Sequence, residues 1–67
     1  MAIRVAWDRN PVSVHGTKSD LELVLNHLRE KYGFRKHSLI MPDRENDEEA
    51  VFFLYSACDP RWITEVL

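Results

Sequence analysis

The chain has 67 residues with a formal net charge of −2, of which 45% are hydrophobic and 30% charged, so it can form one small folded domain over residues 1–67. No segment approaches the roughly 20 apolar residues that a membrane-spanning helix needs, and the near-neutral charge gives no general affinity for polyanions. A single cysteine, Cys58, excludes an internal disulfide and fits a reducing compartment. We therefore expect a cytoplasmic protein.

The first sixteen residues predict a β-hairpin. Residues 2–7 alternate, with large apolar side chains at every second position, as in a strand with one buried face. Residues 8–11, DRNP, have the chemistry of a turn, because Asp and Asn bond their own backbone and Pro fixes φ. Residues 12–15 alternate again before a glycine interrupts the pattern. Two short strands around a tight turn favour a hairpin.

Segment 17–33, TKSDLELVLNHLREKYG, carries the most complete helix signature of the chain. Its apolar residues recur at helical spacing and form one stripe, made of Leu21, Val24, Leu25, Leu28 and Tyr32. Ser19, followed three residues later by Glu22, predicts a capping box at the start. Gly33 stands where a left-handed residue ends a helix. We therefore expect an amphipathic helix over residues 20–32.

The rest of the chain predicts two or three further strands. Residues 38–41, SLIM, form a short apolar run, and residues 50–57, AVFFLYSA, are the most β-prone segment. Because the second segment is apolar on both faces, it predicts a central strand, or a strand with one face covered by a partner. At the end, Asp59 can cap a helix that begins at Pro60. The β-branched residues in 62–67 favour a last strand instead.

These elements together predict an α+β domain. One amphipathic helix is expected to pack on an antiparallel sheet of four to five strands, in the order hairpin, helix and then two to three strands. A chain of this size buries only about 60% of the surface that it exposes when unfolded. A partner protein or self-association, as a homo-oligomer, is therefore a natural source of additional stability.

The loop 43–49, DRENDEE, is strongly acidic, with five acids and one base and hence a local charge of −4. Its acidic residues are Asp43, Glu45, Asp47, Glu48 and Glu49. The D-x-E-x-D spacing is similar to the start of a calcium loop, but Glu48 replaces the required glycine and Leu54 cannot supply the twelfth ligand. A solvated loop that protects edge strands and a patch that docks on a basic partner both explain the composition.

The segment 29–37, REKYGFRKH, is the basic counterpart of this loop. Its cations are Arg29, Lys31, Arg35 and Lys36, and two aromatic residues lie among them. Such a segment can contact phosphates and stack on bases, although cations also complement the end of a helix. The basic and acidic segments together allow a head-to-tail contact between copies of the chain.

The remaining candidate residues have simpler interpretations. Leu23 and His27 lie on the outer helix face, where they mark either a contact surface or ordinary exposed positions. The histidines His15, His27 and His37 fall on three different elements without the spacing of a metal site, so we expect no metal or other cofactor. A nucleophilic Cys58 would need a nearby base, and a structural cysteine is the simpler interpretation. We therefore expect no enzyme.

One pattern along the chain resembles a known family. A strand with a tryptophan (3–7) is followed by a Val-x-Val segment (12–14), the helix phrase T-x-S-D-L-E-L-V-L-N-H-L-R, and strands that end near Asp59 and Trp62. This pattern resembles the small bacterial immunity proteins that neutralise polymorphic toxins, particularly the group associated with nucleic-acid-deaminase toxins. The resemblance implies stoichiometric inhibition by binding over the toxin's active site. It also implies that loop 43–49 contacts a basic nucleic-acid-binding surface.

The order of the elements also resembles the β-grasp interaction domains of the Phox-and-Bem type. Those domains pair a basic strand and helix end with an acidic loop on the next copy, which implies self-assembly as an alternative function. A small nucleic-acid-binding protein that uses Arg35 and Lys36 is a further alternative. The sequence thus favours a non-catalytic protein-binding module, an immunity protein or inhibitor, whose partner is a toxin or another basic protein.

Overall fold

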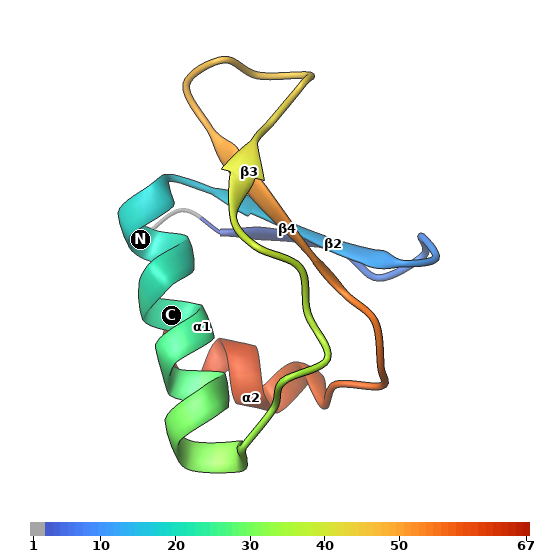
Figure 1. Cartoon of the computed structure of the whole chain (residues 1–67), viewed down its shortest axis with the longest axis vertical. Coiled ribbons are helices and arrows are strands. Elements are labelled where there is room, and N and C mark those ends of the chain that lie inside the picture. The colour runs from blue at the N-terminus through green and yellow to red at the C-terminus, as the bar shows by residue number, and fades with distance from the viewer. Residues whose placement is uncertain (1–2) are drawn as a thin grey trace.

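A four-stranded antiparallel sheet is the framework of the chain (Figure 1). The computed structural model describes residues 3–67, so the predicted strand that starts at Ala2 falls partly outside the described residues. The strands are β1 (Arg4–Ala6), β2 (Val12–Gly16), β3 (Met41–Pro42) and β4 (Ala50–Leu54), in the order β1-β2-β4-β3 across the sheet. Every neighbouring pair runs antiparallel, and the predicted α+β fold is confirmed.

The helix α1 (Lys18–Tyr32) covers one face of the sheet (Figure 1). Val14 of β2 and Phe52 of β4 lie opposite each other in the ladder, and both are completely buried beneath the helix. Four residues of the predicted stripe are buried against them, namely Leu21, Val24, Leu25 and Leu28. Each such side chain contributes about 1.5–3 kcal/mol when it leaves water, so this layer is the main source of stability.

The two ends of α1 show where local sequence signals succeed and fail. Gly33 has φ 62°, and its N–H donates to the Arg29 carbonyl at 3.1 Å, so the predicted left-handed C-terminus is confirmed. The predicted capping box is wrong, because Thr17 and not Ser19 is the N-cap. The Thr17 hydroxyl accepts from the Asp20 N–H at 3.3 Å. Thr17 is still extended (ψ 154°), and the helix starts directly after it, two residues earlier than predicted.

The segment between α1 and β4 is less regular than predicted. Only the last residue of the predicted strand 38–41 belongs to β3, and His37 makes one isolated bridge with Leu54. Ser38 explains the interruption: its N–H donates to the Phe53 carbonyl, while its side-chain hydroxyl, in place of a backbone carbonyl, accepts from the Phe53 N–H, both at 2.8 Å. A side chain therefore completes the edge of β4 where a regular ladder stops.

The end of the chain forms a second helix, α2 (Pro60–Thr64), so the predicted strand over 62–67 is wrong. Asp59 is its N-cap and accepts from the Arg61 N–H at 2.9 Å. A last strand would need a free edge on β4, but β2 and β3 already occupy both sides of β4, which confirms it as a central strand. Ile63 of α2, 1% exposed, joins the core instead.

The molecule is longest in the direction that separates the loop after β3 from the end of α1 (Figure 1). Its extents are 30 × 23 × 18 Å, and loop 43–49 projects beyond the sheet at one end of the long axis. Within residues 3–67, neither helix combines the length and the apolar character that crossing a bilayer requires.

Candidate functional site

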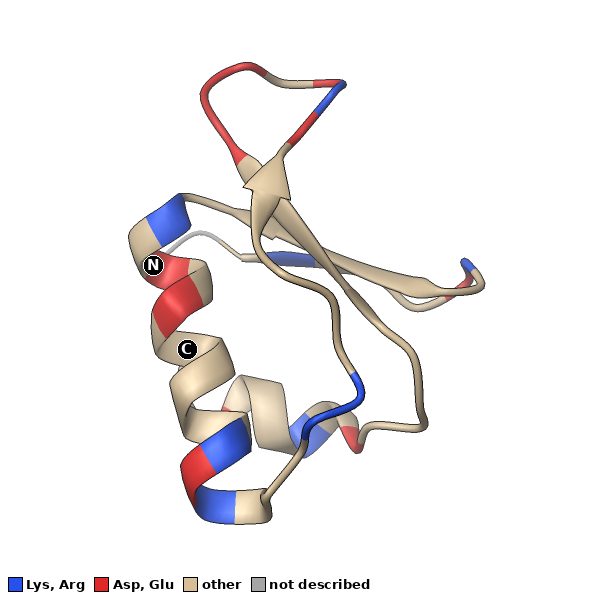
Figure 2. Ribbon diagram, in the orientation of Figure 1, with Lys and Arg blue, Asp and Glu red and all other residues tan. Residues whose placement is uncertain are grey.

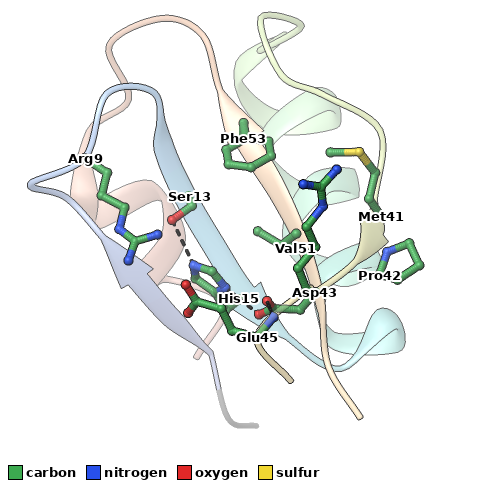
Figure 3. A pocket seen from close by; sticks show the side chains of 10 residues that line it. Arg9, Ser13, His15, Met41, Pro42, Asp43, Glu45, Val51 and Phe53 are labelled. Carbon is green, nitrogen blue, oxygen red and sulfur yellow. Dashed lines mark hydrogen bonds and ion pairs between the residues drawn. The ribbon is translucent and has the colours of Figure 1, made fainter. Parts of the chain in front are cut away.

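Within residues 3–67, no helix covers the sheet face opposite α1. This open face holds the candidate site (Figure 3). Because side chains alternate along a strand, Ser13 and His15 point away from the core residues of β2. Their ladder partners on β4 are Phe53 and Val51, and these residues, with Met41 of β3, line a cavity of about 360 Å³. The open face therefore combines a polar row on β2 with apolar side chains on β3 and β4.

A chain of hydrogen bonds runs across this face from Ser13 through His15 to Asp43, shown by the dashed lines in Figure 3. The Ser13 Oγ lies 2.8 Å from His15 Nε2, and His15 Nδ1 lies 2.8 Å from Asp43 Oδ2. The three residues are buried, with exposed fractions of 1%, 7% and 5% in that order. We call them the relay. No buried side-chain nitrogen or oxygen within residues 3–67 lacks a hydrogen-bond partner, so the relay is fully satisfied.

The second carboxylate oxygen of Asp43 organises the loop itself. Its Oδ1 accepts from the Glu45 N–H at 2.9 Å. This backbone hydrogen bond, followed by the side-chain hydrogen bond to His15, lowers the pKa of Asp43 below its ordinary value of 3.8. Asp43 is thus held as a carboxylate, with one oxygen bonded to the sheet and the other to the loop.

The relay has the same atom-to-atom connections as a Ser-His-Asp catalytic triad. Acyl transfer by such a triad also needs an accessible hydroxyl and N–H donors beside it that can hold an oxyanion. Ser13 is only 1% exposed, and it lies within a strand that is paired on both sides, not at the start of a helix. In the observed conformation the relay joins β2 to loop 43–49.

The five acidic residues predicted to form one contact surface differ in their exposure. Glu45, Asp47 and Glu48 are exposed, as expected for a contact surface. Asp43 is buried, which differs from its predicted place on that surface. Glu49 is half-buried, and Arg4 of β1 lies 3.5 Å from its carboxylate. Three carboxylates of the loop therefore face solvent.

Loop 43–49 has a defined shape because its own groups bond one another. The Asn46 side chain accepts from the Glu48 N–H at 3.0 Å and donates to the Glu49 carboxylate at 3.1 Å. The Glu49 N–H donates to the Asn46 carbonyl at 3.1 Å. Sequence reasoning missed Asn46, although the tendency of Asn to bond a backbone N–H two residues on is the signal that could have identified it.

The predicted basic residues lie at the other end of the molecule (Figure 2). Arg29, Lys31, Arg35 and Lys36 are all exposed. They belong to the end of α1 and the segment after it, whereas the acidic loop lies at the opposite end of the long axis. The two charged segments that the sequence suggested as partners are therefore not brought together within one copy of the chain.

A second polar cluster ties α2 to α1. The Glu65 carboxylate accepts from the Tyr32 hydroxyl at 2.6 Å, from His27 Nε2 at 2.8 Å and from the Lys31 ammonium at 3.3 Å. These donors, Tyr32 first, lower the pKa of Glu65 from 4.5 to about 2. Trp62 stacks on the Tyr32 ring with the centroids 4.3 Å apart. We call Glu65 and its three donors the Glu65 cluster.

The two residues predicted on the outer face of the helix, Leu23 and His27, differ in their surroundings. His27 is half-buried and bonds the Glu65 carboxylate. Leu23 is 53% exposed and stays on the surface. The contact between His27 and Glu65 joins residues 38 positions apart, and no local pattern in the sequence signals it.

Cys58 is half-buried, and its Sγ lies 3.7 Å from the Asp59 carbonyl oxygen. Burial, and then the neighbouring Asp59 carboxylate, raise the pKa of its thiol, which disfavours the reactive thiolate. Within the described part of the chain, no group of three His, Cys, Asp or Glu residues is arranged to hold a metal ion. Comparison with known proteins finds no family model, no curated protein and no solved structure that matches this chain.

Proposed function

We propose that this chain is a non-catalytic protein-binding module, an immunity protein or inhibitor that binds a toxin or another basic, nucleic-acid-acting protein through its acidic surface. The observation that carries the proposal is the acidic loop 43–49, which projects beyond the sheet and is held there by hydrogen bonds to β2 and within the loop (Figures 1 and 2). The loop presents Glu45, Asp47 and Glu48 to solvent.

The charge of this loop suits a basic partner. Three exposed acids and the exposed Arg44 leave a net charge of −2 on its solvent side (three minus one). Such a patch attracts a cationic surface over about 10 Å at 0.1 M salt and raises the association rate. Because the loop is already ordered, less conformational entropy is lost when it binds.

The open sheet face supplies the apolar part of the proposed contact. Met41, 38% exposed, and the half-buried Phe53 line the same cavity as Asp43 and Glu45 of the loop. Stable interfaces combine an apolar centre with a polar rim, and the loop and this face together have that composition. A partner with a phosphate-binding cleft would accept the carboxylates in the cleft and the apolar side chains at its edge.

The test is a binding and inhibition assay against a panel of purified basic toxin domains that act on nucleic acids, deaminases among them. The double variant Asp47→Asn/Glu48→Gln changes the loop, and Glu22→Gln/Glu30→Gln makes the same change in net charge on exposed positions of α1. We expect stoichiometric inhibition of a panel member and an association rate about tenfold lower for the loop variant alone. Equal rates for both variants, or no binding to any panel member, would contradict the proposal.

A second candidate function is self-assembly through opposite charges. The observation that favours it is the placement of segment 29–36 and loop 43–49 at opposite ends of a molecule 30 Å long (Figure 2). At that separation the two charges are screened from each other within one copy. They can meet between copies, in a head-to-tail contact that repeats along a filament or closes into a ring.

Light scattering at two salt concentrations tests this candidate. Self-assembly predicts a particle mass that increases with protein concentration at low salt and returns to that of the monomer above roughly 0.5 M salt. The variant Arg35→Gln/Lys36→Gln should remain a monomer under all of these conditions. A salt-independent mass of the unaltered protein would exclude assembly through these charges.

A further inference from the structure

We propose that Ser13 and His15 are positioning residues of the acidic binding surface: acting through Asp43, they hold loop 43–49 in the conformation that presents its exposed carboxylates to a basic partner. This inference rests on the proposed function. It adds two residues of the open sheet face, neither of which is acidic or exposed, to the determinants of binding.

Asp43 forms the base of the loop. It follows directly after β3, and its N–H donates to the Glu49 carbonyl at 3.1 Å, which closes the loop just before β4 begins. Its Oδ1 accepts from the Glu45 N–H and turns the chain into the loop. The direction in which the loop leaves the sheet therefore depends on the orientation of one carboxylate.

His15 fixes the orientation of the Asp43 carboxylate from a position within the sheet. His15 lies on β2, which is paired with β1 on one side and β4 on the other. Its Nδ1–H donates to Asp43 Oδ2, and the Ser13 hydroxyl donates to its Nε2. A hydroxyl can donate or accept, so the Ser13 contact persists whether His15 is neutral or protonated. The relay is thus a fixed support in both protonation states.

No other side chain of loop 43–49 is attached to the interior. All seven of its residues, DRENDEE, are polar or charged, so no apolar side chain of the loop packs into the core. The pair between Glu49 and Arg4 is largely exposed on the Arg4 side, and such pairs contribute little. The buried contact between Asp43 and His15 therefore attaches the loop to the sheet. Without this contact the hydrogen bonds within the loop lose their fixed base, and the exposed carboxylates take many arrangements relative to the sheet.

The experiment compares two substitutions at one position. Asp43→Ala removes both side-chain hydrogen bonds. Asp43→Asn keeps both, because the amide oxygen can accept from the Glu45 N–H while the amide N–H₂ donates to His15 Nδ1; His15 Nε2–H then donates to Ser13. His15→Leu and Ser13→Ala interrupt the relay at its other members. The urea unfolding midpoint of each variant identifies those that remain folded.

The first readout needs no partner. We expect Asp43→Ala and His15→Leu to speed amide hydrogen exchange at Glu45 and Glu49 about tenfold, with Ser13→Ala smaller and Asp43→Asn close to the unaltered protein. The amides of the helix stripe serve as the internal control. Unchanged loop exchange in folded Asp43→Ala or folded His15→Leu overturns the inference.

The second readout is the association rate with the toxin domain that the unaltered chain inhibits. It should fall for His15→Leu and recover for Asp43→Asn relative to Asp43→Ala. Faster loop exchange without a slower association overturns the inference but leaves the proposed function intact. If the unaltered chain binds no member of the panel, the proposed function fails and the inference fails with it, while the exchange rates still show whether the relay holds the loop.

Discussion

Two carboxylates in this molecule have the same kind of partner in different surroundings. Asp43 bonds His15 across 28 residues of sequence, and Glu65 bonds His27 across 38, each at 2.8 Å. The side chains of the first pair are 9% and 4% exposed for histidine and carboxylate, whereas those of the second are 25% and 36% exposed. One contact joins a loop to the sheet, and the other joins α2 to α1.

The two regions differ in what else holds them. α2 inserts Ile63 into the core and stacks Trp62 on Tyr32, so apolar burial attaches it before any hydrogen bond is counted. Loop 43–49 has no such anchor. Its only buried side chain, Asp43, is polar, and burial makes the loss of a partner costly because water cannot replace it. We infer that polar contacts determine the position of the loop, whereas they only refine the position of α2.

The largest effect is expected from removing the apolar anchor of α2. Ile63→Ala should lower the free energy of unfolding by about 2–5 kcal/mol, because a fully buried branched side chain leaves a cavity. Urea unfolding monitored by tryptophan fluorescence measures the change. Leu23→Ala, at a position that is 53% exposed, is the control and should change the free energy by less than about 0.5 kcal/mol. A loss below that of the control would mean that the Glu65 cluster alone retains α2.

The next effect in size is expected at the centre of the relay. His15→Leu fills the space with an apolar side chain but leaves both Ser13 and the Asp43 carboxylate without their buried partner, so we expect a loss of about 1–3 kcal/mol at neutral pH. Glu65→Gln, measured in the same urea series, should cost less because water reaches its donors. Equal losses would show that exposure does not separate the two regions.

The elements that the sequence predicted correctly depend on neighbours within one turn or one strand. The stripe of α1 needs only its own spacing, and Gly33 needs only its position after the last turn. The capping box failed because Thr17 and Ser19 both carry a hydroxyl, and the end of β2 decides which one is still extended where the helix begins. The strand over 62–67 failed because the edges of β4 were already occupied, which local propensity cannot register.

In the candidate site, too, the features set by local sequence were predicted and those set by the whole sheet were not. Its acidic composition is visible in loop 43–49, and so is its exposure for most residues. The relay cannot be predicted from the sequence. His15 and Asp43 are brought together because β4 pairs with β2 on one side and with β3 on the other. A histidine in a strand and an aspartate in a loop become partners through register, and register is a property of the whole sheet.

A smaller effect is expected in the pH dependence of stability. Folding depresses the pKa of Glu65 from 4.5 to about 2, so its contribution is present above pH 4.5 and is lost as the pH falls towards 2. Glu65→Gln should flatten the stability curve in this window. The pKa of Asp43 is also lowered, from 3.8, so Asp43→Asn should flatten only the part below that pH. Urea midpoints of the unaltered protein and of both variants, measured from pH 5 to about pH 2, test how stability changes with pH. If the Glu65→Gln curve runs parallel to that of the unaltered protein, Glu65 does not cause the loss of stability in this range.

The smallest effect is expected at the most exposed donor of the Glu65 cluster. The Lys31 side chain is 55% exposed and lies 3.3 Å from the carboxylate, so Lys31→Met should leave the urea midpoint unchanged within error at both low and high salt. Tyr32→Phe should lower the urea midpoint, because the Tyr32 hydroxyl donates the shortest hydrogen bond to Glu65. The stacking of the ring on Trp62 is kept in this variant, so the loss reports on the hydrogen bond alone. If Lys31→Met is as damaging as Tyr32→Phe, the donors act cooperatively, as in a buried network. Burial would then not explain why the relay and the Glu65 cluster differ, and the missing apolar anchor of loop 43–49 would be the remaining distinction between them.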